Sequence, residues 1–329
     1  MFLVIMIVVC ALAFDFINGF HDTANAIATV VSTRVLSPRA AILMAGGLNL
    51  VGALCFTKVA ETIAKGLVTG ATLPVILAAI LGAIVWNLAT WYFGIPSSSS
   101  HALVGGLVGA AWVHGGHNSI KWEGVLDKVV LPLVLSPLAG FVIGFIVMAA
   151  IFLFFANAQA AKTGRVFRGL QIVSSAIMSF AHGSNDAQKS MGIIALALTT
   201  LDGHALTKAP VPIWVKIACA IAMAAGTSMG GWRIIKTMGH KIIRLEPVNG
   251  FAAETTASLI ILYATLTGKT VSTTHVISGS IFGVGAAKRF SAVRWSVAQT
   301  MLVAWVLTIP ASATVAALCY FGIKALGVH

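Results

Sequence analysis

The chain has 329 residues, of which 58% are hydrophobic and only 9% are charged, and its mean hydropathy is +0.96. An ordinary soluble protein carries about 25% charged residues because its surface faces water. This composition therefore excludes a soluble globule, a disordered chain and a small disulfide scaffold, and it predicts an all-α polytopic membrane protein.

The apolar segments predict about ten to twelve membrane segments, since a spanning helix needs roughly 20 apolar residues. We expect the passes in chain order at 1–33, 40–57, 71–95, 101–120, 129–156, 169–201, 213–232, 251–268, 270–287 and 295–320. The segments 1–33 and 169–201 are long for one straight span and have polar residues near their centres. We expect their helices to be interrupted there, at Gly19 and Gly183.

The basic residues orient this series of helices. With the N-terminus outside, twelve of the 21 Lys and Arg lie on the inner side and eight on the outer side, and Lys189 lies within a span. Cytoplasmic loops carry the excess of Lys and Arg. The pattern predicts a multi-pass protein of the cell membrane with both termini outside and the segment Lys162–Arg168 cytoplasmic. It also explains the net charge of +12 without a nucleic-acid partner.

Polar residues recur at matching places in the two halves of the chain. His21-Asp22-Thr-Ala-Asn25 follows Gly19, and Ser184-Asn-Asp186-Ala-Gln-Lys189 follows Gly183. Further along each half, Ser98-Ser-Ser-His101 matches Ser272-Thr-Thr-His275, and Gly94 matches Gly268. Ten extra residues in the second half fall in the connection around Asp202–Pro212. These matches predict an internal duplication.

Each half contains an odd number of passes, so the second copy enters the membrane from the opposite face. This is the inverted-repeat architecture of secondary transporters, whose sites lie near the bilayer midplane on interrupted helices. We expect a first repeat at 1–156, a short cytoplasmic linker at 157–168 and a second repeat at 169–329. Further interruptions are expected at the Ser/Thr runs after Gly94 and Gly268.

The two Ser/Thr runs are expected to bind an anion. Each precedes a Gly-rich apolar stretch, so its residues can cap a helix and leave free backbone N–H groups after them. Such a helix start attracts anions through its dipole and its unsatisfied donors. The candidates are Ser98, Ser99, Ser100, Ser272, Thr273 and Thr274.

The carboxylates Asp22 and Asp186 oppose anion binding. A carboxylate about 4 Å from an anion costs about 4 kcal/mol at an effective dielectric constant of 20. The conflict is resolved if each Asp is protonated or holds a cation when the anion binds, which is the physical basis of symport. Asn25 could add an oxygen ligand for a hard cation such as Na⁺. Lys189, at the matching place, could pair with Asp186 at i+3, which we favour, or contact the anion.

These motifs resemble those of the inorganic phosphate transporter (PiT) family. The resemblance covers both halves, including the segments Gly19–Ala26, Pro96–Gly105, Ala181–Gly192, Gly250–Glu254 and Val271–His275. It implies phosphate uptake by symport with Na⁺ or H⁺, no cofactor, an inverted-repeat fold and a homodimer in the lipid bilayer. One departure is Thr270, where the first half has Pro96.

The resemblance also assigns the site residues. It places phosphate at Asp22, Ser98–Ser100, Asp186, Gln188 and Ser272–Thr274, and the coupling cation at Asp22, Asn25, Asp186 and Glu254.

Three alternatives remain open from the sequence. The first is a carrier of another tetrahedral oxyanion or of a metal–phosphate complex, since hydroxyls and backbone amides fit these ligands equally. The second is a membrane-embedded phosphohydrolase that uses Ser100 with His101. We disfavour an enzyme because adjacent residues point poorly at one another and because the pair recurs in both halves. The third is a channel.

Overall fold

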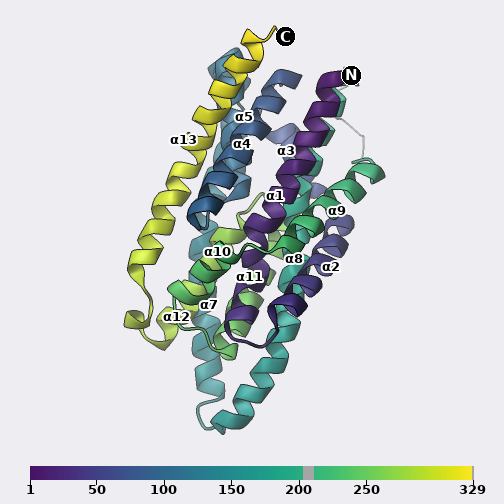
Figure 1. Ribbon diagram of the computed structural model, residues 1–329. Coiled ribbons are helices and arrows are strands. Elements are labelled where there is room, and N and C mark those ends of the chain that lie inside the picture. The colour runs from purple at the N-terminus through teal and green to yellow at the C-terminus, as the bar shows by residue number, and fades with distance from the viewer. Residues whose placement is uncertain (203–210, 328–329) are drawn as a thin grey trace.

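A computed structural model describes residues 1–202 and 211–327, and in this part of the chain every regular element is a helix (Figure 1). The ten extra residues predicted within the second half, around Asp202–Pro212, fall largely on 203–210, outside the described residues. The longer helices are α1 (Phe2–Ser32), α2 (Pro38–Cys55), α4 (Leu73–Phe93), α5 (Ser99–Gly115), α7 (Leu131–Phe154), α8 (Ala160–Asp202), α9 (Ile213–Met229), α11 (Pro247–Thr267), α12 (Thr273–Lys288) and α13 (Trp295–Ala325). The short ones are α3 (Lys58–Gly66), η1 (His117–Ser119), α6 (Trp122–Val125), η2 (Leu126–Val130), α10 (Trp232–Lys236), η3 (Thr237–Lys241) and η4 (Phe290–Ala292).

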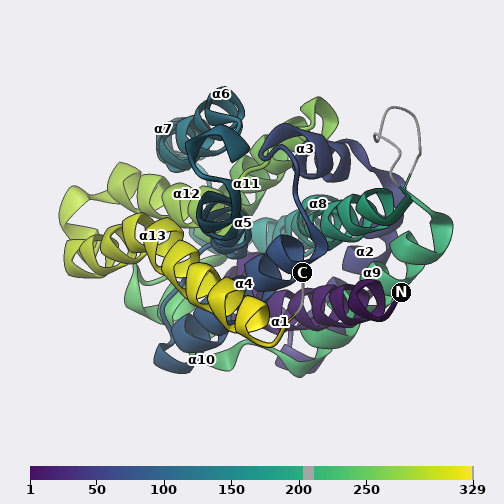
Figure 2. The same ribbon diagram turned by 90° about the horizontal axis from the view of Figure 1, so that it is seen from above.

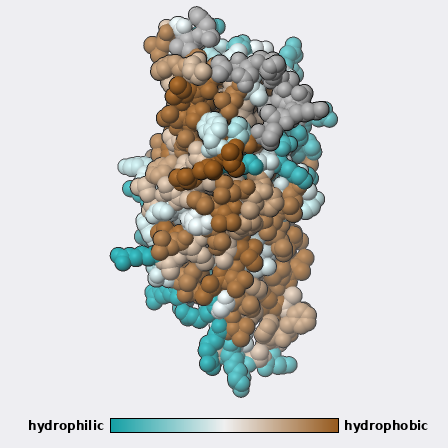
Figure 3. All heavy atoms as spheres, turned by 90° about the vertical axis from the view of Figure 1, so that its right-hand side faces the viewer, coloured by the Kyte–Doolittle hydropathy of each residue, from teal (hydrophilic) through white to brown (hydrophobic). Residues whose placement is uncertain are grey.

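The surface and the helix lengths fit a membrane protein. Six of the described helices or helix pairs are long and apolar enough to span a bilayer, or seven if the bent pair Ile213–Met229 and Trp232–Lys241 counts as one span. Large side chains such as Phe2, Leu43, Phe154 and Val306 are exposed. Figure 3 shows a hydrophobic surface over much of one face, with hydrophilic residues toward both its upper and its lower end. A soluble monomer rarely exposes so large an apolar surface, and the prediction of an all-α polytopic membrane protein is confirmed.

The ten predicted passes differ from these spans in two ways. Helices α5, α9 and α12 have only 17, 17 and 16 residues, or about 24 to 26 Å at 1.5 Å per residue, which is less than the hydrocarbon core. Helix α8 has 43 residues, but its central turns are polar and buried. Length and hydropathy alone therefore do not identify four of the ten predicted membrane segments, those that correspond to α5, α8, α9 and α12.

The expected interruptions occur in one pair of motifs and not in the other. Helix α4 ends at Gly94 and α11 ends at Gly268, both in the left-handed region with φ of 66° and 71°, and extended segments lead from them to α5 and α12. By contrast, α1 and α8 run unbroken through Gly19 and Gly183, so the interruptions predicted there are wrong.

Gly19 and Gly183 are instead places of close helix approach. A Cβ atom on Gly19 would meet the backbone of Met223 in α9, and one on Gly183 would meet the backbone of Asn49 in α2. Small residues allow membrane helices to pack at such short distances. The glycines thus bring α1 against α9 and α8 against α2 while leaving the helices continuous.

Helices from the first half of the chain pack against helices from the second half. Helix α1 packs on α9 while α8 packs on α2, and α5 packs on α13 while α12 packs on α7. The two termini lie at one end of the bundle, and the turn between α7 and α8 lies at the other (Figure 1); Figure 2 views the bundle from the end that carries the termini. Residues 160–168, expected within the linker, are the first turns of α8.

Candidate functional site

The site forms where the short helices α5 and α12 begin. Ser98 caps α5 and Ser272 caps α12, and each hydroxyl accepts a bond of 3.2 Å from the backbone N–H three residues later, that of His101 or His275. The first backbone bonds across these caps run from Ala102 to Ser98 and from Val276 to Ser272. The N–H groups of Ser99, Ser100, Thr273 and Thr274 therefore precede the helical ladder and have no acceptor within their own helix.

The two helix starts are adjacent in space. The imidazole rings of His101 and His275, the residues that follow the two Ser/Thr runs, have centroids 4.9 Å apart. His275 also stacks on Trp305 at 4.0 Å, and the Trp305 indole donates to the carbonyl of Pro96 at 3.1 Å. Two positive ends of helix dipoles thus point into one buried region, which favours an anion there.

Asp22 connects both helix starts to α1. Its Oδ2 accepts a hydrogen bond of 2.6 Å from Ser99 of α5, and its Oδ1 lies 3.4 Å from the Thr274 hydroxyl of α12. His21 Nδ1 is 2.7 Å from the same Oδ1, and its Nε2 is 3.0 Å from the hydroxyl of Thr90 in α4. Asp22 is only 2% exposed, so all of its partners are within the protein.

Asp186 lies opposite, on α8, and has a charged partner. Lys189 Nζ is 2.7 Å from its Oδ1, which confirms the pair predicted at i+3. His182 Nε2 is 3.4 Å from Oδ2, and Thr273 of α12 donates to Oδ2 at 3.3 Å. Ligand atoms of Asp22, His182 and Asp186 lie within 4.8 Å of one another. The two motif carboxylates therefore belong to one site.

Asn25 links the two sides. Its Nδ2 donates to the hydroxyls of Thr273 at 3.2 Å and Thr274 at 2.9 Å, and these threonines reach Asp186 and Asp22 respectively. Its Oδ1 is buried and has no hydrogen-bond partner among the described residues. A free amide oxygen beside two carboxylates is a suitable ligand for a hard cation.

Two of the predicted site residues also hold neighbouring segments together. Ser100 donates to the carbonyl of Val271 at 3.2 Å and so ties the start of α5 to the segment before α12. Gln188 Oε1 accepts from the backbone of Val59 at 2.8 Å and of Ala60 at 3.2 Å, and so caps the start of α3.

Glu254 of α11 forms a separate buried cluster. Its carboxylate accepts hydrogen bonds from Thr29 of α1 and Ser174 of α8 and lies 3.5 Å from Nε2 of Gln171. All three partners are neutral. Thr29 is seven residues after Asp22, or about 10 Å along the helix axis, so Glu254 lies away from the two aspartates.

The structure also shows site residues that the sequence reasoning missed. Thr90 and Ser97 hold the far side of the His21 ring, with a bond of 2.8 Å between their hydroxyls. Asp15 is fully buried in α1 with Ser190 and Cys219 as polar neighbours. The sequence did contain one indication of this residue, because Asp15 is a lone carboxylate two turns before Asp22 in an apolar segment.

Fold and site together define a class. A polytopic helical protein with two short helix starts converging on a buried carboxylate pair has the features of a secondary transporter for an anion. Comparison with known proteins identifies the family: the Phosphate transporter family matches residues 18–316. The chain belongs to this family, as its motifs predicted.

Similar proteins agree with this assignment. The chain is 54% identical over 323 residues to a Bacillus subtilis protein and 50% identical over 322 residues to a Rhizobium meliloti protein. Both matches cover 97% of this chain and 96% of the relative, and both relatives bear the name "Probable low-affinity inorganic phosphate transporter". A solved structure described as "The sodium-dependent phosphate transporter" superposes with a TM-score of 0.89 at 26% identity, covering 99% of this chain and 100% of the other. The relatives are named as transporters, in agreement with the prediction that the chain is not an enzyme.

Proposed function

We propose that this protein is a secondary active transporter that imports inorganic phosphate by symport with Na⁺. The observation that carries the proposal is the position of Asp22, whose carboxylate is joined to both anion-binding helix starts, through Ser99 and Thr274. A cation at Asp22 changes the charge beside both helix starts at once. Cation and phosphate therefore bind together more favourably than either binds alone.

Phosphate is bound in this proposal by the N–H groups and hydroxyls of Ser99, Ser100, Thr273 and Thr274. Ser98 and Ser272 hold the two helix starts in shape as caps. The motif residues supply no arginine, so phosphate has no bidentate clamp and is released readily on the other side. Asp186 is already paired with Lys189, so in this proposal it orients hydrogen-bonding groups at the site and adds little net negative charge.

Na⁺ is the coupling ion that the site favours. Asp22 and the free Asn25 Oδ1 supply oxygen ligands beside the hydroxyls of Thr273 and Thr274. Hard cations prefer oxygen ligands. Glu254 with Thr29 and Ser174 is a second set of oxygens on the cation's route. The sodium dependence named for the similar solved structure supports Na⁺ over H⁺.

The repeat boundaries and the orientation belong to this proposal. Helices α1–α7 form one repeat within 1–156, and helices α8–α13 form the other, at 169–329 with the first turns of α8 in the linker. The packing of helices of one repeat against helices of the other supports the assignment. The positive-inside rule places both termini outside the cell membrane and the α7–α8 turn in the cytoplasm. The family resemblance adds a homodimer.

The test is phosphate uptake into proteoliposomes with the Na⁺ gradient and the pH gradient imposed separately. Saturable uptake driven by inward Na⁺ alone is expected, with sulfate competing weakly. Uptake driven only by the pH gradient would replace Na⁺ by H⁺. Phosphate hydrolysis from an ester without transmembrane flux, or flux that does not saturate, would overturn the transporter assignment.

A second candidate is a carrier of a metal–phosphate complex, favoured by the closeness of Asp22, His182 and Asp186. A carboxylate–imidazole–carboxylate set suits a divalent transition metal. Uptake of phosphate that requires a divalent metal with affinity for imidazole, such as Zn²⁺, and not Na⁺ would identify this mode. Lys189, at 2.7 Å from Asp186, competes with such a metal, which is why we place Na⁺ symport first.

A further inference from the structure

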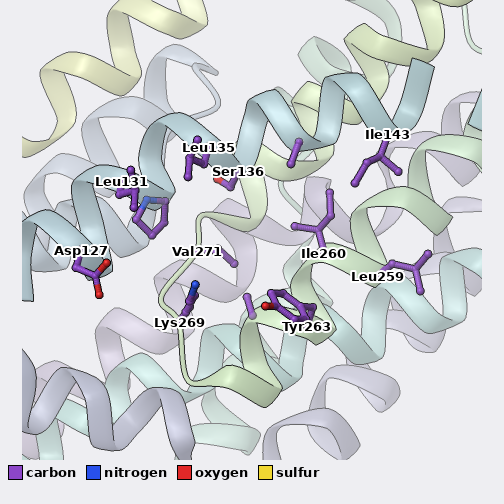
Figure 4. Close-up of a pocket in the computed structure, with 13 residues that line it drawn as sticks. Asp127, Leu131, Leu135, Ser136, Ile143, Leu259, Ile260, Tyr263, Lys269 and Val271 are labelled. Atoms are coloured by element: carbon purple, nitrogen blue, oxygen red, sulfur yellow. The ribbon is translucent and has the colours of Figure 1, made fainter. Parts of the chain in front are cut away.

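A groove on the outer flank of the bundle is lined by α7 and α11 (Figure 4). It has a volume of about 380 Å³ and runs from Asp127 and Lys269 at one end to Ile143 and Leu259 at the other. Leu131 and Leu135 line its length and are half exposed, at 50% and 49%. The walls are apolar, and the only charged residues are at one end.

A second groove adjoins the first. It has a volume of about 770 Å³ and is lined by Glu123, Leu126, Asp127, Val130, Leu131 and Val134. Asp127 and Leu131 line both grooves. All residues that line the second groove belong to the one helical stretch of α6, η2 and α7, so this groove is a shallow face of that stretch that meets the first groove at Asp127 and Leu131.

This shape matches one class of molecule. A phospholipid has two apolar chains that diverge from a single polar headgroup, and the grooves provide two apolar tracks that meet at one polar mouth, formed by Glu123, Asp127 and Lys269. Both grooves lie on the apolar face that a bilayer covers, where exposed leucines and valines of η2 and α7 meet lipid.

The charges at the mouth select among headgroups. The charged residues that line the grooves are Glu123, Asp127 and Lys269, with a sum of −1. Lys269 suits the phosphate of a lipid, and the two carboxylates suit an ammonium group. An anionic lipid such as phosphatidylglycerol has the phosphate but no ammonium group, so it leaves the two carboxylates without a cationic partner. The mouth therefore fits a zwitterionic lipid with a primary amine.

We propose that these paired grooves bind one aminophospholipid, phosphatidylethanolamine, with its phosphate at Lys269 and its ammonium group at Glu123 and Asp127. The lipid's position has a structural consequence, because Val271 lines the first groove and accepts the hydrogen bond from Ser100. The lipid lies against the segment that leads into α12. The proposal is independent of the transported substrate and of the coupling ion.

The test measures which lipid the purified protein retains. The wild-type protein is incubated in detergent with equal amounts of phosphatidylethanolamine and phosphatidylglycerol, and the bound lipid is counted by native mass spectrometry. One unit of charge at a membrane surface is worth about 1 kcal/mol, so we expect about fivefold more phosphatidylethanolamine than phosphatidylglycerol. Equal retention, or a preference for phosphatidylglycerol, would overturn the proposal.

A matched pair of variants locates the site. Leu135→Trp fills the first groove, while Leu138→Trp adds the same ring one turn away on the same helix at a similar exposure of 55%, outside both grooves. Leu135→Trp should lose most of the retained lipid and Leu138→Trp should keep it. Equal retention by the two variants would contradict the site, as would release of a second protein copy by Leu135→Trp in place of lipid.

A charge reversal tests the headgroup contact without enlarging a side chain in the groove. Asp127→Lys changes the sum at the mouth from −1 to +1, since Asp127 is exposed and lines both grooves. The preference should move to phosphatidylglycerol. Glu61→Lys, an exposed carboxylate of α3 that lines neither groove, is the control and should leave the preference unchanged. An unchanged preference in Asp127→Lys would overturn the headgroup assignment.

Discussion

The two motif carboxylates occupy matching places but have different partners. Asp22 is held by Ser99, Thr274 and the His21 ring, whereas Asp186 has Lys189 at 2.7 Å in addition to Thr273 and His182. The position three residues later is Asn25 in one motif and Lys189 in the other. Asp186 has the ammonium group of Lys189 as a partner on its own helix, whereas Asp22 has an imidazole and hydroxyls. Under the proposed function the two motifs differ accordingly, with Asp22 binding the exchangeable cation and Asp186 holding the permanent charge of Lys189.

The largest expected effect follows from removing the Asp22 charge. Asp22→Asn keeps the shape but loses a cation attraction worth about 4 kcal/mol at 4 Å and an effective dielectric constant of 20, so Na⁺-driven uptake should fall by more than about 100-fold. Uptake into proteoliposomes measures the loss, and a normal elution profile in detergent shows that the variant folds. Na⁺-dependent uptake at the wild-type rate would remove Asp22 from the coupling mechanism.

The next test makes the second motif like the first. Lys189→Asn leaves Asp186 buried without its cation, which should destabilise the protein by about 3–5 kcal/mol, and Asp186→Asn/Lys189→Asn should recover most of that loss. Thermal unfolding in detergent measures both. Added Na⁺ should stabilise Lys189→Asn more than the wild type, because Asp186 then resembles Asp22. A single variant as stable as the wild type would show that the Lys189 charge is not needed.

A smaller difference is expected between the matching hydroxyls. Ser99 donates to Asp22 at 2.6 Å, and Thr273 donates to Asp186 at 3.3 Å. A hydrogen bond to a charged group is worth about 1.5–3 kcal/mol. Ser99→Ala should therefore weaken the apparent Na⁺ affinity about tenfold, and Thr273→Val about threefold or less.

Uptake measured against Na⁺ concentration separates these two hydroxyl variants. Ser280→Ala serves as the control, since among the described residues the Ser280 hydroxyl donates only to the carbonyl of Val276 in its own helix. A greater loss in Thr273→Val than in Ser99→Ala would reverse the roles assigned to the two sides.

The smallest effect is expected at the helix caps, where the two sides are alike. Ser98 and Ser272 each accept one bond of 3.2 Å, so Ser98→Ala and Ser272→Ala should each cost about 1 kcal/mol of stability. Thermal unfolding measures the cost. A loss several times larger in one variant would indicate that its serine does more than cap a helix.

The sequence predicted the charges and caps of the site well because these depend on local spacing. The i+3 pair of Asp186 with Lys189 and the helix starts at Ser98 and Ser272 follow from helix geometry alone. The family assignment likewise depended on motifs visible in the chain, and the family comparison confirmed it.

The errors arose where packing between distant segments decides the outcome. Gly19 and Gly183 looked like helix breaks, but the backbones of α9 and α2 occupy the space beside them. The hydrogen bonds from the backbone of Val59 and Ala60 to Gln188 could likewise not be foreseen, because α3 and α8 are far apart in the sequence. The Glu254 cluster joins residues of α1, α8 and α11, and no local pattern shows that Thr29 and Ser174 meet there.

The unbroken course of α8 has a mechanical consequence. Its 43 residues make a rod about 64 Å long, which exceeds the full thickness of a bilayer with its headgroups. The rod carries Asp186 and Lys189 on its buried stretch, and Arg168 near its other end donates to the carbonyl of Arg34 in the turn after α1 at 3.0 Å. Because α8 is continuous, the ion pair and the Arg168 contact are joined by one stiff helix and change position together when that helix is tilted at the α7–α8 turn.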